Sequence, residues 1–465
     1  MANAATTELF RLHESIAPKA QPRPQTKSQN AIQNIIAIRR NPLDYFGALI
    51  NDDRDFIPID LGIDKLYLLN HADHIRHVFQ DNAHNYIKSK YYRQIEFLFG
   101  DGMFTAEGEQ WSWQRRAAQP AFKGPDLKKM AAEMVVAMED MVRRWEQYAK
   151  KGEPVDVSRE ATRITLDIMF RTLFSRPLGD QANPLFDAIL YLLIQTENRI
   201  WSPVKTPLWL PSQSNKKFKR CLRIIEEVIN MTISERLADN RRHDDLLDCM
   251  IDAEKERGNG VPNLKSLRDQ VASFVVPGHE TTATALTWTF YHLARNALLT
   301  RRVTSTVDGV LGRRAPEFGD LKSLAYVEAV MKESLRLYPP VWTFSRTAVE
   351  DDHFGRHEIA AGGIVMVCAY ALQRSRRYWH APEAFDPDRF LGPRPKDERF
   401  YYFPFGGGHR ICIGMRFALM ESVIVLSMLM QHFEMELVPG LQISPQAMLN
   451  IRPNKSIKMY LRKRS

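Results

Sequence analysis

The stretch "FPFGGGHRICIG", residues 403–414, sets three consecutive glycines and a basic pair before a single cysteine. An apolar segment, 415–435, follows at once, and its residue pattern predicts a helix. The amino end of a helix carries partial positive charge and free N–H groups, which stabilise a thiolate. Glycines let a backbone approach a large flat group closely. The stretch therefore predicts that Cys412 is a thiolate at a helix start, beside a bulky flat ligand.

Two simpler interpretations fit these residues less well. A glycine-rich phosphate loop needs a Lys followed by Ser or Thr at the start of its helix, and "GGGHRICIG" (406–414) has no such pair. An inert buried cysteine needs no glycines around it. A thiolate that faces a flat ligand indicates haem bound through sulfur.

The stretch resembles the cysteine loop of the cytochrome P450 family, F-x-x-G-x-R-x-C-x-G. It matches at Phe405, Gly408, Arg410, Cys412 and Gly414. The resemblance implies haem b as the cofactor, with Cys412 as the proximal iron ligand. It also implies that Phe405 packs over the sulfur and that Arg410 reaches a haem propionate.

Two further arginines match family motifs that hold the haem propionates. "WSWQR" places Trp111 and Arg115 four residues apart on one helical face, as in the family's W-x-x-x-R, and the resemblance implies that both donate to one propionate. Arg346, in "TFSRTAVED" (343–351), is implied to bind the other. The simpler alternatives are an amphipathic helix face for the first motif and a surface arginine at a strand end for the second.

A charged triad is also implied. "ESLR" places Glu333 and Arg336 three residues apart on a helical face, and "FDPDRF" (385–390) supplies Arg389. By residue spacing alone, the first pair is a weak surface ion pair. The family resemblance implies instead that the three charges are buried together and fix the cysteine loop, a structural role.

The segment 263–296 predicts a long helix that is apolar nearly all round in its middle and therefore buried. It contains "PGHETTA" (277–283), which matches the family's oxygen-site pattern A/G-G-x-D/E-T-T. The resemblance implies that Gly278 leaves room beside the haem. It implies catalytic roles for Thr281, which supplies a hydroxyl near the bound oxygen, and Glu280, which relays protons to it.

The chain departs from the family at two positions. Pro277 stands where the family usually has Ala or Gly, and a proline there removes a helix hydrogen bond and clashes with the carbonyl of Ser273. A kink is predicted at this point. Gln373 stands where many relatives have His.

The chain has 465 residues, of which 44% are hydrophobic and 26% charged, as in ordinary globular proteins. Its net charge of +9 is compatible with an anionic membrane, an acidic protein partner or no partner. No run of Lys and Arg with interleaved aromatic residues is present, so nucleic acid is not expected as a partner.

The four cysteines form no C-x-x-C pair, which argues against a disulfide framework or a structural zinc site and favours a reducing compartment. Besides Cys412 they are Cys221, Cys249 and Cys368, which we expect to be buried. Residues 1–30 contain "PKAQPRPQ" (18–25) and no long apolar segment, so a mobile tail is predicted. We expect no transmembrane anchor and a cytoplasmic protein.

Helical periodicity recurs at 126–152, 218–242, 263–296 and 415–435, and strand signals gather between 345 and 372. The predicted fold class is mainly α with a small β region. The resemblance implies the cytochrome P450 fold, a single triangular domain over 31–465 whose long central helix crosses over the haem.

The resemblance implies a monooxygenase that inserts one atom of O₂ into a lipophilic small molecule of terpenoid, steroid or fatty-acid type. No fused reductase domain fits in the chain, so an external acidic ferredoxin or flavodoxin, with its reductase, would supply the electrons. Lys123, Lys128 and Lys129 are candidate docking residues for such a partner.

The predicted substrate pocket is apolar and aromatic. Lys88, Lys90 and Arg93 are near enough in the sequence to meet an anionic head group. By family analogy the residues that line the pocket are Phe274, Pro277, Val341, Trp342 and Phe344.

Three alternatives remain open. A haem-thiolate peroxygenase, or an O₂-independent lyase or isomerase, typically lacks the acid–alcohol pair that Glu280 and Thr281 form here. A non-catalytic haem-binding protein would not need that pair or an aromatic pocket. A basic binding protein without haem would be colourless.

Overall fold

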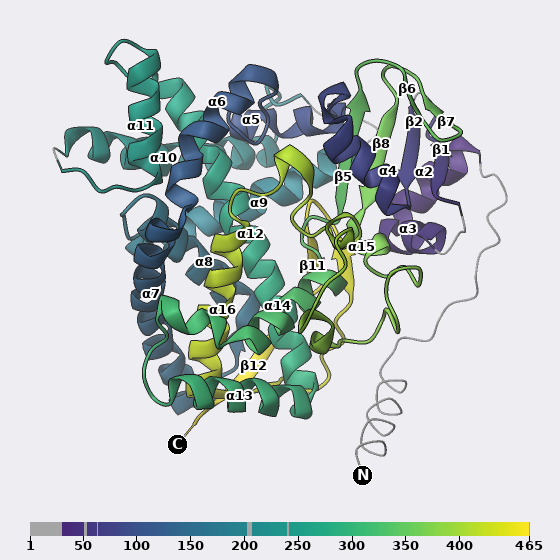
Figure 1. Ribbon diagram of the computed structural model, residues 1–465. Coiled ribbons are helices and arrows are strands. Elements are labelled where there is room, and N and C mark those ends of the chain that lie inside the picture. Colours follow the sequence, from purple (N-terminus) through teal and green to yellow (C-terminus); the bar gives the residue numbers. More distant parts are fainter. Residues whose placement is uncertain (1–29, 51–53, 63, 202–206, 240, 465) are drawn as a thin grey trace. The chain divides into compact units, whose positions relative to one another are not determined.

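The computed structural model describes residues 30–465 except 51–53, 63, 202–206, 240 and 465. The predicted tail, 1–30, therefore lies outside the described residues apart from Asn30. The chain divides into two compact units, one formed by Met1–Tyr86 and Lys332–His409 and the other by Ile87–Met331 and Arg410–Ser465 (Figure 1). The catalytic domain predicted over 31–465 stays a prediction.

The first unit is built on a mixed sheet. Its strands follow the order β1 (Phe56–Asp60), β2 (Lys65–Leu69), β8 (Ile364–Cys368) and β5 (Thr343–Ala348), and β3 (Tyr86–Lys88) begins here. Strand β2 pairs with β8 in parallel, whereas the pairs β1–β2 and β8–β5 are antiparallel. Every residue of β8 is buried. This agrees with its unbroken apolar sequence, which is typical of a central strand that is covered on both faces.

A hairpin and several short helices complete the first unit. The hairpin joins β6 (Asp352–Phe354) to β7 (His357–Ile359), so strands lie where the sequence pattern predicts them. The helices are α2 (Ala31–Arg40), α3 (Pro42–Ile50), α4 (Ala72–Arg76), the π-helix η1 (His77–Asp81), η2 (Ala83–Asn85), α15 (Ala369–Leu372), η7 (Pro387–Phe390) and η8 (Glu398–Phe400). Helix α14 (Ala325–Leu337) and the turn η9 (Gly408–Arg410) span the boundary between the units.

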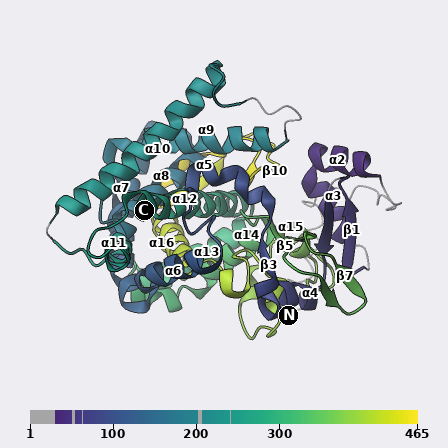
Figure 2. The same cartoon turned by 90° about the horizontal axis from the view of Figure 1, so that it is seen from above.

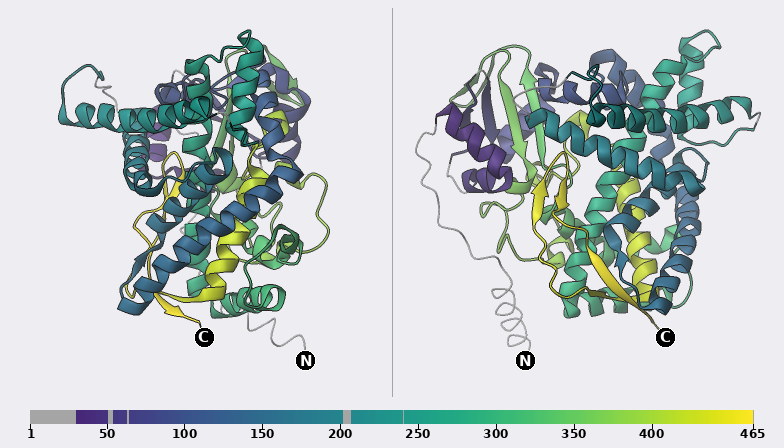
Figure 3. Two further views of the ribbon diagram at one scale, coloured as in Figure 1. Left: turned by 90° about the vertical axis from the view of Figure 1, so that its left-hand side faces the viewer. Right: turned by 180° about the vertical axis from the view of Figure 1, so that it is seen from behind.

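The second unit is mainly helical. Its α-helices are α5 (Glu96–Phe99), α6 (Gly108–Ala118), α7 (Gly124–Lys151), α8 (Val157–Leu173), α9 (Ala182–Trp201), α10 (Gln213–Ala238), α11 (Leu246–Arg257), α12 (Leu264–Arg295), α13 (Ala297–Leu311) and α16 (Met415–His432). Its 3₁₀ turns are η3 (Lys90–Ile95), η4 (Gln119–Phe122), η5 (Gly179–Gln181) and η6 (Phe318–Lys322). Helices α9 and α10 lie side by side (Figure 2), and α7 packs on α16 (Figure 3).

Two small sheets belong to the second unit. In one, β12 (Lys458–Lys463) lies between β4 (Val155–Asp156) and β9 (Phe433–Leu437). The other is the hairpin of β10 (Pro445–Ala447) and β11 (Ile451–Pro453). The helix predicted over 415–435 ends at His432, because its last residues enter β9.

Helix α12 is the centre of the second unit. The Asn263 side chain caps its amino end, and the helix is buried on nearly all faces, chiefly against α8. It runs unbroken through Pro277. Side chains on the carboxyl side of Pro277 add hydrogen bonds to the helix backbone: His279 Nδ1 lies 2.6 Å from the Val275 carbonyl, and the Thr281 hydroxyl donates to the Pro277 carbonyl at 2.9 Å. Neither bond reaches the Ser273 carbonyl, which is the acceptor that loses its helical N–H to the proline.

Candidate active site

Cys412 lies in the turn that leads into α16, whose amino-terminal cap is Gly414. Its side chain is exposed, whereas Cys221 and Cys368 are buried as predicted and Cys249 is partly exposed. The protein atoms around the sulfur nevertheless shield it from much of the solvent, and this desolvation raises the pKa of the Cys412 thiol. The Gly414 N–H and the Arg115 guanidinium lower the same pKa. An accessible sulfur of this kind becomes a stable thiolate when it binds a metal cation.

Arg115, on α6, is the cation near this sulfur. Burial lowers the pKa of its guanidinium, and the charge of Cys412 raises it. Within the part of the chain that the structure describes, no side chain forms an ion pair or a hydrogen bond with this guanidinium. A half-buried, unpaired guanidinium is suited to an anionic ligand such as a carboxylate.

Arg410, two residues before Cys412, is held by protein groups instead. It forms an ion pair with Glu107, donates to the Ala106 carbonyl at 3.0 Å, and lies over the Trp111 ring at 4.3 Å from its centroid. The predicted contacts of Arg410 and Trp111 with a propionate stay predictions. What the structure shows is that Arg410 fixes the cysteine turn to the start of α6.

Glu280, on α12, is buried and paired with an arginine that the sequence did not reveal. Arg452 Nη2 of β11 lies 2.8 Å from Glu280 Oε1, and the Thr284 hydroxyl donates to the same oxygen at 3.3 Å. No motif marks position 452, so only the tertiary structure discloses this pair. Glu280 therefore has a charged partner on the side of β11 and the Thr281 hydroxyl as its neighbour along the helix.

Gly278 and Phe274 serve the packing of α12. A Cβ atom at Gly278 would lie 3.0 Å from the Met169 sulfur of α8, so the glycine permits close contact of the two helices, a reason that the sequence did not disclose. Phe274 is buried, and Phe122 of η4 stacks on it at 6.1 Å between ring centroids. Phe122 also meets Phe417 of α16 at 6.4 Å, so η4 lies against both α12 and α16.

The predicted triad of the first unit is brought together. Glu333 and Arg336 are fully buried, and the Arg336 guanidinium donates a hydrogen bond to each oxygen of the Glu333 carboxylate, at 2.7 and 2.8 Å. Arg389 Nε lies 3.3 Å from the same carboxylate. Arg336 also donates to the carbonyls of Gln373, Pro382 and Ala384, so its charge and its donors are well satisfied.

Gln373, the departure from the family, has a structural explanation. It is fully buried, its amide nitrogen donates to the carbonyls of Leu335 and Arg336, and its amide oxygen accepts from the Phe403 N–H at 2.7 Å. The side chain thus ties α14 to the start of the cysteine stretch. Sequence reasoning missed this role.

Arg346 lies on β5 and is buried. It donates to the Ser345 carbonyl at 2.9 Å, and its guanidinium lies 4.9 Å from the centroid of the Phe79 ring. No carboxylate of the described residues pairs with it. Like Arg115 in the second unit, it is an arginine suited to an anionic ligand.

The glycine run of the cysteine stretch is also required by the packing of the protein itself. A Cβ atom at Gly408, where φ is +65°, would lie 1.5 Å from the Phe79 carbonyl oxygen. At Gly407 it would lie 2.5 Å from the Phe403 ring. These glycines therefore admit atoms of the protein itself, and their predicted role toward a flat ligand stays a prediction.

Phe344, one of the aromatic residues predicted for the pocket, lies against this stretch. A Cβ atom at Gly406 would lie 3.2 Å from the Phe344 ring, and that ring meets Phe403 edge-on at 5.1 Å. Phe344 thus supports the glycine run. The other predicted residues of this unit are partly exposed, namely Val341, Trp342 and Phe405.

A cavity of about 780 Å³ lies within the second unit, over the start of α12. Lys88 and Arg93 line it together with five carboxylates, those of Glu96, Asp101, Glu107, Glu254 and Asp269. So polar a lining does not suit a lipophilic substrate. The predicted apolar pocket is therefore not this cavity.

Comparison with known proteins places these observations in a family. The cytochrome P450 profile matches residues 22–460. The chain belongs to the cytochrome P450 family. It is 30% identical over 412 residues to putative cytochrome P450 132 of Mycobacterium tuberculosis. The aligned region covers 85% of this chain and 87% of the relative.

Two other relatives carry descriptions of their activity. Cyclooctat-9-en-7-ol 5-monooxygenase of Streptomyces melanosporofaciens is 31% identical, with 87% of each chain covered. Carotene epsilon-monooxygenase of Arabidopsis thaliana is 31% identical, over 84% of this chain and 76% of the relative.

The predicted family, the P450 fold class and the enzyme class, a cytochrome P450 monooxygenase, are confirmed. Family membership implies haem with a cysteine thiolate ligand. Within the second unit, an accessible thiol with a half-buried arginine beside it fits a thiolate-bound group that carries a carboxylate. Within the described residues, no helix has the length and apolar character needed to cross a membrane.

Proposed function

We propose that the protein inserts one atom of O₂ into a lipophilic molecule of terpenoid, steroid or fatty-acid type, with electrons from an external redox partner. The observation that carries this is the accessible Cys412 thiol, which lies at the start of α16 beside the unpaired guanidinium of Arg115. Cys412 would hold the iron of haem b, and Arg115 and Arg346 would receive its carboxylates. The bound haem supplies the redox chemistry of oxygen, which no side chain provides.

Residues of α12 would transfer protons from solvent toward the oxygen that is reduced. Because the Thr281 hydroxyl donates to the Pro277 carbonyl, its oxygen remains free to accept a further hydrogen bond. Glu280 precedes Thr281 in the helix, and its carboxylate is paired with the partly exposed Arg452 of β11. This placement suits a carboxylate that takes protons from the solvent side and passes them toward Thr281.

The substrate class rests on two observations. Cyclooctat-9-en-7-ol and carotene, in the names of the two monooxygenase relatives, are terpenoid molecules, so we favour a terpenoid or a similar lipophile. The residues proposed to contact it are apolar, namely Phe274, Pro277, Val341, Trp342 and Phe344.

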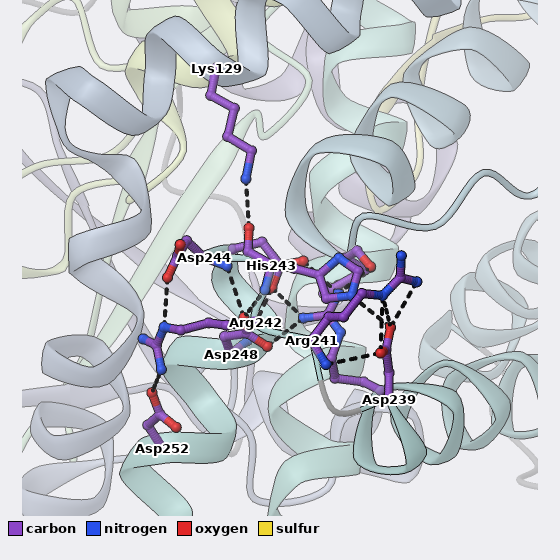
Figure 4. A network of polar contacts seen from close by, with 11 residues as sticks. Lys129, Asp239, Arg241, Arg242, His243, Asp244, Asp248 and Asp252 are labelled. Atoms are coloured by element: carbon purple, nitrogen blue, oxygen red, sulfur yellow. Dashed lines mark hydrogen bonds and ion pairs between the residues drawn. The ribbon is translucent and has the colours of Figure 1, made fainter.

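The redox partner we propose is an acidic ferredoxin or flavodoxin, in the cytoplasm. Lys123 and Lys128 are exposed at the start of α7, directly after Phe122 and its contacts with α12 and α16. Lys129 is exposed as well, but its ammonium group donates to the His243 carbonyl at 2.6 Å, within a network of charged residues (Figure 4). Docking would therefore depend mainly on Lys123 and Lys128.

The test is the absorbance spectrum of the dithionite-reduced protein with and without carbon monoxide, for the wild type and for Cys412→Ala. We expect the strongly red-shifted band of a thiolate-bound haem in the wild type and its loss in the variant. Cys221→Ala, which removes a buried cysteine, is the control and should keep the band. Haem without that band in the wild type would contradict the proposal. Turnover with peroxide but not with reductase and NADPH would favour a peroxygenase.

A further inference from the structure

Glu421, on α16, is a buried acid with no assigned partner. It lies nine residues beyond Cys412, is fully buried, and neither of its carboxyl oxygens has a hydrogen-bond partner among the described residues. No ion pair of the described residues involves it. Buried polar groups are nearly always hydrogen-bonded, so this exception requires an explanation.

The polar group that interacts with the Glu421 carboxyl is the Thr282 hydroxyl of α12. Helix α12 carries five threonines in its second half, and four of them donate a hydrogen bond inside the helix: Thr281, Thr284, Thr287 and Thr289. Thr282 does not, although it is buried, and its hydroxyl has no partner among the described residues. A threonine whose hydroxyl does not donate to a backbone carbonyl of its own helix can form a hydrogen bond with another element.

The two groups are close. Burial raises the pKa of Glu421 well above its ordinary value, and the Thr282 hydroxyl acts in the opposite direction. The two side chains are close enough to interact but form no well-aligned hydrogen bond, and a small rotation of either one, or one buried water molecule, would satisfy both. A carboxyl group in such surroundings is neutral and can donate a hydrogen bond.

We propose that Glu421 is a positioning residue, whose protonated carboxyl group hydrogen-bonds Thr282, directly or through one water, and holds α12 against α16 at the residue next to Thr281. The consequence for catalysis rests on the proposed function. The helix that follows the cysteine turn is thereby connected to the helix that carries the catalytic hydroxyl. A displaced Thr281 would waste reducing equivalents as peroxide without a loss of haem.

The first experiment asks whether the acid is protonated. The infrared spectrum of the haem-loaded wild type at neutral pH, minus that of Glu421→Gln, should contain the C=O stretch of a protonated carboxylic acid, with its shift in D₂O. A carboxylate signal in its place would overturn the proposal. This measurement needs no substrate and no turnover, so its outcome is independent of the proposed function.

The second experiment asks whether the two groups act as a pair. Product and peroxide per NADPH are measured for Glu421→Leu, Thr282→Val and the double variant. We expect each single change to lower the coupling of NADPH use to product by roughly 2-fold to 10-fold, as for the loss of one hydrogen bond, and the double variant to be no worse than either single one. Additive losses would overturn the proposal.

Two controls separate positioning from general packing. Glu421→Gln keeps a neutral hydrogen-bond donor and should restore coupling, whereas coupling as low as that of Glu421→Leu would contradict the proposal. Ser427→Ala removes another buried, unpartnered hydroxyl of α16 and should leave coupling unchanged. If the wild type forms no product at all, the proposed function fails, and the infrared result still decides the state of Glu421.

Discussion

At the scale of residues, the site depends on charges whose partners are distant in the chain. Glu280 is the clearest case, because a nearly buried carboxylate is tolerated only when its charge is compensated. Arg452 supplies that compensation from a short hairpin near the carboxyl end. The pair links the stability of the second unit to the residue that we propose relays protons.

Replacement of Arg452 by Leu should therefore destabilise the protein. It leaves the buried Glu280 with only the Thr284 hydroxyl, and we expect a loss of about 3 kcal/mol in the free energy of unfolding, since broken buried pairs cost this much. Arg462→Leu is the matched control, because Arg462 and its partner Glu436 are both exposed and such pairs contribute about 1 kcal/mol or less. Urea unfolding monitored by circular dichroism measures both. Equal losses would contradict a buried role for the pair.

Glu421 predicts a dependence of stability on pH. Its pKa is raised in the folded state, so the unfolded chain loses its proton first as the pH rises, and stability falls from about pH 4.3 until the buried carboxyl itself ionises. Glu421→Gln removes this pH-dependent contribution to the free energy of unfolding. The stability of the variant relative to the wild type should thus rise by about 1.4 kcal/mol per pH unit above pH 5. A difference that stays constant between pH 5 and 7 would show that Glu421 is ionised when folded.

The sequence disclosed the residues of local motifs and not their tertiary partners. Glu333, Arg336 and Arg389 were predicted to meet, and they do. Arg452, Gln373 and Glu421 were missed, because what matters for each is burial and a contact with a distant segment, and no spacing records either property.

At the scale of elements, helices were easier to predict than strands. Four long helices lie where periodicity places them, since an amphipathic or apolar run of that length has few alternatives. Strands β1 and β2 were not predicted: "FIPID" (56–60) contains a proline, and the partner of β2, β8, lies far along the chain. Parallel pairing of distant strands leaves no local signal.

The glycines of the cysteine stretch were predicted to admit a ligand, and the structure adds a second reason for them, contact with the protein's own atoms. Gly408→Ala should prevent correct folding of the cysteine stretch, because its Cβ would lie 1.5 Å from the Phe79 carbonyl. Gly440→Ala is the control: φ is +80° there, but no atom lies within 4 Å of the new carbon. The control should cost about 1 kcal/mol from backbone strain, and Gly408→Ala about 3 kcal/mol more from overpacking. Urea midpoints and haem content measure both, and equal effects would mean that the collision is relieved at no cost.

At the scale of the whole molecule, the net charge of +9 would act on the proposed acidic partner through the surface around the proposed docking residues. Lys123 and Lys128 have no partner among the described residues, whereas the ammonium of Lys129 is engaged by the His243 carbonyl. The hydrogen bond to a neutral carbonyl leaves the charge of Lys129 in place but holds its side chain, whereas Lys123 and Lys128 are available to contact a partner directly. The predicted partner is acidic, so its approach should be sensitive to salt and to the sign of these side chains.

Reversal of one charge, Lys128→Glu, should slow reduction of the protein by an acidic ferredoxin roughly five-fold at low salt, since two charge units at about 8 Å in water amount to about 1 kcal/mol. The difference should shrink as ionic strength rises. Lys255→Glu on α11, an equally exposed lysine, is the control for net charge and should have a smaller effect. Stopped-flow reduction under carbon monoxide measures the rates. Equal slowing by both variants would show that net charge, and not a docking face at the start of α7, governs the encounter.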